Sequence, residues 1–282
     1  MSTYTGNCEP FKVFRRKRPS VMGIINFTAD SFYAQSRAVT DAQIAEKTEQ
    51  MISEGADIID VGAYSSRPGA EDISADDEID RLLSGLKILR KTAPDIPVSV
   101  DTFRVKAVEK IFDRFGHFIV NDISAGELDG KMFSVVAKLN LPYIAMHMKG
   151  NPQTMQNNPV YNDLIKEITS YFDEKIKRLR DAGIKDIIID PGFGFGKTME
   201  QNYDLLACLK HFKNFELPLL VGFSRKSMLY KLLNTTPEES LNATTAVNAV
   251  ALMNGADILR VHDVRAAVET VEIIEKLKNK NN

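Results

Sequence analysis

The stretch Glu54-Gly55-Ala56-Asp57-Ile58-Ile59-Asp60-Val61-Gly62 returns near the end of the chain as Asn254-Gly255-Ala256-Asp257-Ile258-Leu259-Arg260-Val261. In both copies a glycine stands where an amphipathic stretch ends, and an apolar run of strand length follows directly. Glycine readily adopts the left-handed conformation that closes many helices. A third segment, Ala182-Gly183-Ile184-Lys185, occupies the same place before Ile187–Asp190. The repetition indicates a chain built from strand–helix units.

Short apolar runs alternate with longer amphipathic stretches along the whole chain, which is typical of βα units around a parallel sheet. We expect strands at Val21–Asn26, Ile58–Gly62, Val98–Asp101, Phe118–Asp122, Tyr143–His147, Ile187–Asp190, Leu219–Phe223 and Ile258–Val261. Between and after them we expect helical stretches such as Asp41–Glu54, Asp76–Lys91, Arg104–Phe115, Leu164–Ala182, Met199–Leu209, Ser240–Met253 and Val264–Leu277. Each strand is expected to be followed by its helix.

No linker rich in Pro, Gly or Ser and no low-complexity tract divides the sequence. We therefore predict an α/β protein whose single domain is a (β/α)8 TIM barrel over residues 19–282, preceded by an N-terminal extension at residues 1–18. A doubly wound open sheet is the alternative, which eight evenly spaced strands disfavour.

The composition excludes two classes of partner. The 36 basic and 38 acidic residues nearly cancel to a net charge of −2, so the chain has no excess of positive charge with which to release counterions from a nucleic acid. Met1–Pro10 is polar and lacks the apolar core of a signal peptide, and no apolar run approaches the roughly 18 residues of a membrane span. Cys8 and Cys208 have neither CxxC nor metal-finger spacing. We expect a soluble cytoplasmic protein without nucleic-acid or membrane partners.

Polar residues stand at the carboxyl ends of all the expected strands. In strand order these are Asn26, Ser65-Ser66-Arg67, Asp101-Thr102, Asn121-Asp122, His147, Asp190, Ser224-Arg225-Lys226-Ser227 and Arg260-Val261-His262-Asp263. Taken singly, an Asp or Asn after a strand is as readily a helix N-cap, and Asp122 is a better cap candidate than Asn121. His147 is expected to be structural rather than a ligand contact. Because chemistry in such barrels lies at the carboxyl ends of the strands, the complete set predicts a site at that mouth.

The Gly-rich segment Asp190–Thr198 ends in Gly-Lys-Thr, as phosphate-binding loops do. Its spacing does not fit that motif, because Pro191 occupies the position that requires glycine, and the dinucleotide pattern GxGxxG is absent as well. The glycines instead allow the backbone to approach a flat ligand closely, and Phe195 offers a ring face for stacking.

Eight segments match, in order, the motifs of a known family. They are Met22–Asn26, Ser66–Gly69, Ser99–Thr102, Asn121–Ser124, Met146–Gly150, Asp190–Lys197, Gly222–Ser227 and Arg260–Val264. From about Val21 to its end the chain thus resembles dihydropteroate synthases, the sulfonamide targets of folate biosynthesis. The resemblance implies a cytoplasmic, homodimeric transferase of the same barrel fold. It would condense 6-hydroxymethyl-7,8-dihydropterin pyrophosphate with p-aminobenzoate, giving 7,8-dihydropteroate and pyrophosphate.

The resemblance also assigns roles to residues. The catalytic set would be Asp101, Asn121, Asp190, Lys226, Arg260 and His262. The pterin would contact Asp101, Asn121, Met146, Asp190, Phe195, Gly222 and Lys226, with the Asp190 carboxylate accepting from the donor-rich ring edge. The pyrophosphate would contact Asn26, Ser66, Arg67, Arg260 and His262. The p-aminobenzoate would contact Ser66, Phe195, Lys226 and Ser227, the last at the start of a short helix whose N–H groups and dipole favour a carboxylate.

The expected cofactor is Mg2+, because a leaving pyrophosphate departs more easily when its charge is neutralised. Asn26 resembles the family's metal-contacting position. The family is thought to lose pyrophosphate first and then to capture the pterin cation with the arylamine. Such a reaction needs no strong general base, and the sequence offers neither a Ser-His-Asp nor a Cys-His arrangement.

Two loops depart from the family pattern. Ala29-Asp30-Ser31-Phe32 lacks the usual proline and is not followed by the usual glycine pair, and Ala63-Tyr64-Ser65-Ser66 replaces the common Gly-Glu-Ser-Thr. These changes bear on loop dynamics and on p-aminobenzoate affinity more than on the reaction. Two alternatives stay open: a corrinoid-dependent methyltetrahydrofolate methyltransferase, and a non-catalytic pterin-binding homologue. The segments Ser224–Ser227 and Arg260–Asp263 count against the methyltransferase, which has no pyrophosphate to hold.

Overall fold

A computed structural model describes residues 18–27, 41–65, 72–151, 155 and 159–279. The strands are β1 (Ser20–Asn26), β2 (Ile58–Gly62), β3 (Val98–Asp101), β4 (Ile119–Asp122), β5 (Tyr143–Met146), β6 (Ile187–Asp190), β7 (Leu220–Val221) and β8 (Ile258–Val261). The helices are α1 (Asp41–Ser53), α2 (Ala75–Thr92), α3 (Val105–Phe115), α4 (Met132–Leu139), α5 (Leu164–Asp181), α6 (Met199–Ala207), the 3-10 helix η3 (Leu209–Phe215), α7 (Ser227–Tyr230), α8 (Leu241–Met253) and α9 (Val264–Lys278).

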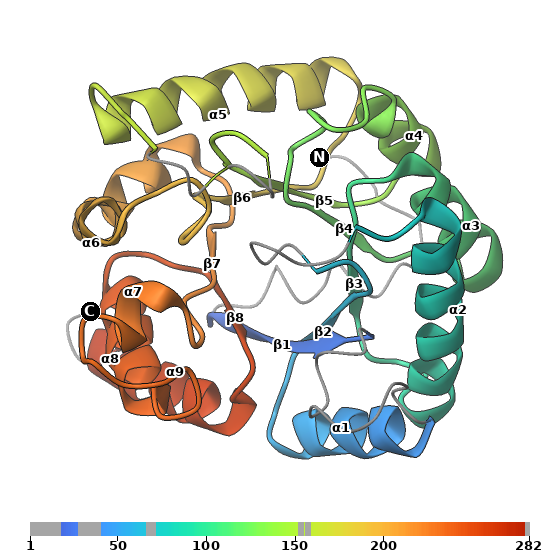
Figure 1. Ribbon diagram of the computed structural model, residues 1–282, viewed down its shortest axis with the longest axis horizontal. Coiled ribbons are helices and arrows are strands. Elements are labelled where there is room, and N and C mark those ends of the chain that lie inside the picture. Colours follow the sequence, from blue (N-terminus) through green and yellow to red (C-terminus); the bar gives the residue numbers. More distant parts are fainter. Residues whose placement is uncertain (1–17, 28–40, 66–71, 152–154, 156–158, 280–282) are drawn as a thin grey trace.

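The strands form one parallel sheet that curls into a barrel inside a ring of helices (Figure 1). The ladder runs β6-β5-β4-β3-β2-β1-β8-β7, so that each strand lies beside its neighbours in sequence. A parallel bridge between Ile189 and Leu219, with the Ile189 N–H donating to Pro218 at 3.0 Å, joins the two ends of the ladder. The predicted TIM-barrel fold is confirmed, and the open doubly wound sheet is excluded.

The inside of the barrel changes character along its axis. Side chains alternate between the two faces of a strand, so every second residue points inward. A separate buried cluster, from seven of the strands, is wholly apolar: Met22, Ile58, Ile119, Ile144, Ile188, Leu220 and Ile258. Two positions farther along the eight strands stand Ile24, Asp60, Asp101, Asn121, Met146, Asp190, Gly222 and Arg260. At the corresponding position β3 has the buried Ser99, so the lower layer is hydrocarbon from seven strands and one hydroxyl, whereas the carboxyl-end mouth is polar.

The repeated Gly-Ala-Asp segment ends helices and also holds neighbouring strands together. Gly55 and Gly255 have positive φ angles of 94° and 97°, as expected for helix ends, and so does Gly183. The Asp57 carboxylate accepts from the Val21 N–H at 2.9 Å, and Asp257 accepts from the N–H of the residue before β7 at 2.8 Å. Both aspartates lie directly before a strand, at the end of the barrel opposite the mouth.

The structure adds to or corrects the expected elements at four places. Helix α4 follows β4, where a helix is expected but its bounds are not predicted, and helix η3 follows α6; α4 has only eight residues and η3 is a 3-10 helix, so neither shows a long amphipathic period. Strand β7 is limited to Leu220–Val221, since only these residues pair with β8. Asp122 does not cap a helix; its carboxylate accepts from the N–H groups of Ser124 and Gly126, and so shapes the loop after β4. The proposed extension, residues 1–18, lies almost wholly outside the described residues and remains a prediction.

Replacing Asp57 with Ala should destabilise the barrel. The buried Val21 N–H would lose its acceptor and Arg18, which donates to Asp57 at 2.7 Å, its ion-pair partner. We expect a loss of about 1–3 kcal/mol in the free energy of unfolding, measured by urea denaturation. Asp57→Asn keeps an acceptor oxygen and should lose less; equal stability of wild type and Asp57→Ala would contradict this role.

Candidate active site

Arg260 on β8 is the charged centre of the mouth. Its Nε donates to Asp60 on β2 at 2.7 Å, and its Nη2 donates to Asp101 on β3 at 2.8 Å. The guanidinium thus reaches across β1 to two carboxylates, and the Asp60 side chain is fully buried. Within the described residues Nη1 of Arg260 has no hydrogen-bond partner, so one face of the cation remains for a ligand.

Asn121 joins the same network from β4. Its Nδ2 donates to Asp60 at 3.2 Å. The side chain is buried, and this hydrogen bond sets the orientation of the amide group and therefore of its oxygen. Burial raises the pKa of Asp101, Arg260 opposes that rise, and Asp60 adds to it. The sequence-predicted pair Asp101 and Asn121 therefore lies in a single network with Arg260.

Asp190 and Lys226 form the opposite wall. Asp190, at the end of β6, is 7% exposed and accepts from the Gly192 N–H at 2.8 Å. Burial raises its pKa, while Lys226 lowers it. Burial also lowers the pKa of Lys226 to about 8, against the attraction of Asp190. The Lys226 ammonium donates to the Phe193 carbonyl and lies 4.8 Å from the centre of the Phe195 ring. A carboxylate, a cation and an aromatic face are thus adjacent.

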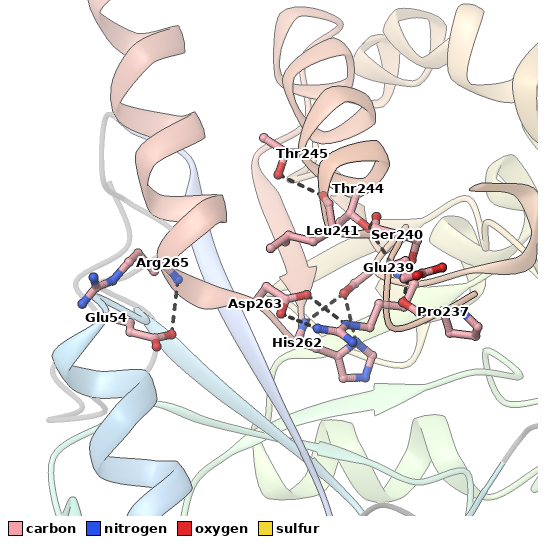
Figure 2. A network of polar contacts seen from close by, with 12 residues as sticks. Glu54, Pro237, Glu239, Ser240, Leu241, Thr244, Thr245, His262, Asp263 and Arg265 are labelled. Carbon is pink, nitrogen blue, oxygen red and sulfur yellow. Dashed lines mark hydrogen bonds and ion pairs between the residues drawn. The ribbon is translucent and has the colours of Figure 1, made fainter. Parts of the chain in front are cut away.

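The loops after β7 and β8 are held together by polar contacts (Figure 2). Ser224 Oγ lies 3.0 Å from His262 Nδ1 and accepts from the His262 N–H at 3.1 Å. Arg225 makes a two-pronged ion pair with Asp263, at 2.7 and 3.1 Å. Its backbone N–H donates to Thr244 in α8. Ser224 and Arg225 are therefore fixed by the two residues that follow β8, and Arg225 also by α8.

The other predicted site residues occupy different settings. Met146 and Gly222 are buried in the upper layer of the barrel, whereas Asn26 is half-buried at the end of β1. Ser227 is exposed and begins α7, which has only four residues. The helix dipole invoked for Ser227 is thus that of a single turn. Ser66 and Arg67 lie outside the described residues.

The altered loop after β2 is anchored by a cluster around Arg104. Arg104 donates to the buried Glu78 at 2.7 Å and to the Ile73 carbonyl at 2.8 Å. Its guanidinium lies 5.2 Å from the Tyr64 ring centre and 5.1 Å from that of Phe103. Tyr64, which replaces the family's usual glutamate, is thus packed against a cation.

A family model described as "Pterin binding enzyme" matches residues 22–262. The chain belongs to this pterin-binding enzyme family. It is 42% identical over 259 residues to the dihydropteroate synthase of Escherichia coli K12, with 91% of each chain covered. Synechocystis dihydropteroate synthase is 40% identical over 264 residues, covering 93% of this chain and 91% of the relative.

Solved structures of the family agree with this fold. A Yersinia pestis dihydropteroate synthase in complex with a sulfonamide drug superposes with a TM-score of 0.87 at 40% identity, covering 93% of this chain and 95% of the other. The enzyme of Xanthomonas albilineans with 4-aminobenzoic acid has a TM-score of 0.85 at 33% identity, covering 93% and 94%. Dihydropteroate synthase activity, that of a transferase, is therefore assigned to this member of the family, in preference to a methyltransferase or a non-catalytic homologue.

Two residues of the mouth escaped the sequence-based prediction. Asp60 stands in the middle of a buried strand rather than at its end; a charge inside the apolar run Ile58–Gly62 is the signal that could have revealed it. Lys197 belongs to the phosphate-loop-like run and to the family segment Asp190–Lys197, but the sequence assigns it no role of its own, although its side chain is buried.

Asp60→Asn should lower the pKa of Asp101. The substitution keeps the shape of the side chain but removes a negative neighbour, and it leaves Arg260 with Asp101 as its one carboxylate partner in this network. Titration of the Asp101 carboxyl group by carbon-13 NMR measures the shift, with Asp263→Asn as a control outside the network. An unchanged or raised Asp101 pKa would show that Asp60 is not coupled to it.

Proposed function

We propose that this mouth condenses 6-hydroxymethyl-7,8-dihydropterin pyrophosphate with p-aminobenzoate, yielding 7,8-dihydropteroate and pyrophosphate. The observation that supports this best is the pairing of a buried carboxylate, Asp190, with the cation Lys226, opposite the network of Asp101, Asn121 and Arg260. The pterin is a flat ring rich in hydrogen-bond donors and carries an anionic pyrophosphate, so the carboxylates and the cations of this mouth complement it. The sulfonamide and 4-aminobenzoic acid complexes of the relatives support the same ligands here.

The pterin is proposed to bind at the floor of the mouth. Asp190 has one oxygen engaged by the Gly192 N–H, and the carboxylate can still accept from a ring amino group. Asn121 contributes its amide oxygen, Asp101 a second acceptor, and Lys226 a donor for a ring acceptor. Met146 and Gly222 provide apolar surface without a polar competitor. A polar group left unpaired here costs about 1–3 kcal/mol, so the array also rejects the wrong ring.

The pyrophosphate is proposed to contact Arg260 and His262. Arg260 lies on β8, and its Nη1 has no hydrogen-bond partner among the described residues. The ring of His262, which Ser224 orients, directly follows that strand. Phosphate oxygens form strong charge-assisted hydrogen bonds with a guanidinium. Ser66 and Arg67 are proposed to complete this part of the site.

Mg2+ fits the donor set proposed for the pyrophosphate. The described residues include no group of three or more His, Cys, Asp or Glu side chains suited to hold a metal. Mg2+ does not require such a group, because it keeps several waters and is often held by one or two protein oxygens together with phosphate oxygens. Asn26 offers an amide oxygen, and the adjacent Gly62 has no side chain to fill the space between Asn26 and Asp101. The ion would neutralise charge on the leaving pyrophosphate.

The p-aminobenzoate is proposed to lie against Phe195 and Lys226, with its carboxylate near Ser227 and Ser66. Among the described residues, the carboxylates of this region are assigned to the pterin, and the Lys226 ammonium donates to the Phe193 carbonyl. The arylamine is proposed to attack after pyrophosphate has left, an order that needs no strong general base. The carboxylates of Asp101 and Asp190 favour the pterin cation that this order requires. Loss of a proton from the amine then restores neutrality.

We also propose that the chain is cytoplasmic and acts as a homodimer. No helix in the described part of the chain has the length and apolar character to cross a membrane. Helices α8 and α9 carry the exposed apolar side chains Val250, Met253, Ile273 and Leu277, which supports burial of this face between two copies. Sedimentation equilibrium would then give twice the mass of one chain.

The proposed reaction is tested by pyrophosphate release. We expect release from dihydropterin pyrophosphate to depend on Mg2+, and dihydropteroate to form only when p-aminobenzoate is present. The mass spectrum of the product identifies the new carbon–nitrogen bond. No product under any metal condition would contradict the proposal.

Arg260→Ala should weaken binding of dihydropterin pyrophosphate about 10- to 100-fold more than binding of the bare hydroxymethyl pterin. A charge-assisted hydrogen bond is worth about 1.5–3 kcal/mol, and only the phosphorylated ligand loses it. The bare pterin serves as the baseline, because the variant also leaves Asp60 and Asp101 without their cation. Calorimetry with and without Mg2+ measures both ligands, and Asn26→Ala should reduce the metal-dependent gain. Equal losses for the two ligands would assign strand β8 a structural role only.

A further inference from the structure

Lys197 is buried inside the glycine-rich loop after β6. Its ammonium group donates to the Gly192 carbonyl at 2.9 Å and to the Phe195 carbonyl at 3.1 Å, both within the loop. It also lies 3.0 Å from Nδ1 of His147, which follows β5. The side chain is 3% exposed. A single cation therefore connects two points of the loop with the neighbouring strand end.

The contacts match the valence of an ammonium group. Three N–H bonds meet three acceptors, provided that Nδ1 of His147 carries a lone pair. Burial and the nearby lysines lower the pKa of His147, which favours that neutral form. Burial also lowers the pKa of Lys197 to about 7, whereas Asp190 raises it. Such a buried cation is costly unless its hydrogen bonds are complete, so the loop has a strong preference for this shape.

The loop needs such a restraint because its glycines leave the backbone free. Gly192, Gly194 and Gly196 all have positive φ angles. A Cβ atom on Gly192 would lie 1.9 Å from the His147 carbonyl oxygen, and one on Gly196 would lie 2.5 Å from the Lys149 carbonyl oxygen. Close approach therefore excludes larger residues, and the stiffness that side chains would supply must come from another source.

The restrained segment carries two groups that contact Lys226. Its Phe193 carbonyl accepts from Lys226, and its Phe195 ring lies 4.8 Å from the same ammonium. The outer end of the loop is fixed separately, since Thr198 and Gln201 cap α6 reciprocally. Within the loop, the Gly194 N–H donates to Asn202 at 2.7 Å and the Tyr161 hydroxyl donates to the Gly196 carbonyl at 2.8 Å. Lys197 adds the contacts to the carbonyls of Gly192 and Phe195, and so restrains the part that carries Phe193 and Phe195.

We propose that Lys197, bonded to His147, is a positioning residue that holds the loop after β6 so that Phe195 and the Phe193 carbonyl face the arylamine side of the mouth. The consequence for catalysis rests on the proposed function; the restraint on the loop does not. Of the pterin contacts expected above, Phe195 belongs to this loop, whereas the others lie on the strands or in the loop after β7. Most of the pterin contacts are therefore expected to survive loss of the restraint.

Lys197→Met tests both parts. Hydrogen exchange of the ligand-free protein, measured by mass spectrometry, should show amides 192–196 exchanging at least about 10-fold faster than in the wild type. The exchange rates of amides in the eight strands should be unchanged. The KM for p-aminobenzoate should rise about 10-fold, while the calorimetric Kd for dihydropterin pyrophosphate changes less than about 3-fold. Unchanged exchange at 192–196, or equal losses for both substrates, would overturn the proposal.

Three further variants separate this role from general destabilisation. Lys175→Met removes another buried lysine, on α5, and should leave both the loop exchange and the KM for p-aminobenzoate unaltered. His147→Asn keeps an acceptor near the place of Nδ1 and should retain most of the loop protection, whereas His147→Leu should lose it. Equal behaviour of the two His147 variants would contradict the proposal even if Lys197→Met failed to fold. Absence of product in the wild type would refute the proposed function, and the exchange experiment would still decide on the restraint.

Discussion

The ion pairs of Arg260 are the interaction on which the site depends. A guanidinium and two carboxylates inside a barrel are costly to desolvate, and they persist only because each satisfies the others. Asp60, fully buried, has its charge balanced by Arg260, and Asp101 shares the same cation. Below them the barrel is closed by hydrocarbon side chains from seven strands and one hydroxyl. These polar groups therefore find almost no polar partners deeper in the barrel, and their free hydrogen-bonding atoms point toward the mouth.

The two-residue alternation of side chains along a β-strand made the layout of the barrel mouth largely predictable. Once the apolar runs are placed, alternation fixes which residues point inward, and strand-end residues such as Asp101, Asn121 and Asp190 are then expected at one mouth. The fold and its strand order required no more than this pattern and the short connections. Family resemblance, rather than spacing, suggested what each side chain contacts, and those roles are proposals for this chain.

Other features depend on contacts that no local pattern encodes. Asp60 has its function only because Arg260, far away in sequence, reaches it across β1. Lys197 turns back into its own loop, whereas its position in a Gly-Lys-Thr sequence suggests an exposed phosphate ligand. Helix α4 is too short for periodicity to detect, and β7 is shortened because pairing with β8 ends after Val221. The three-dimensional contacts of these residues and elements, rather than their local sequence, determine their roles and bounds.

The Gly-Ala-Asp segments affect which parts of such an enzyme can evolve without loss of the fold. Asp57 and Asp257 secure the strands from the end of the barrel opposite the mouth. An insertion, deletion or exchange in a loop at the opposite end touches neither aspartate, and its effect on the scaffold is correspondingly small. Tyr64, where the family usually has glutamate, exemplifies such a change. Inhibitor sensitivity and substrate affinity can accordingly diverge among relatives whose barrels remain superposable.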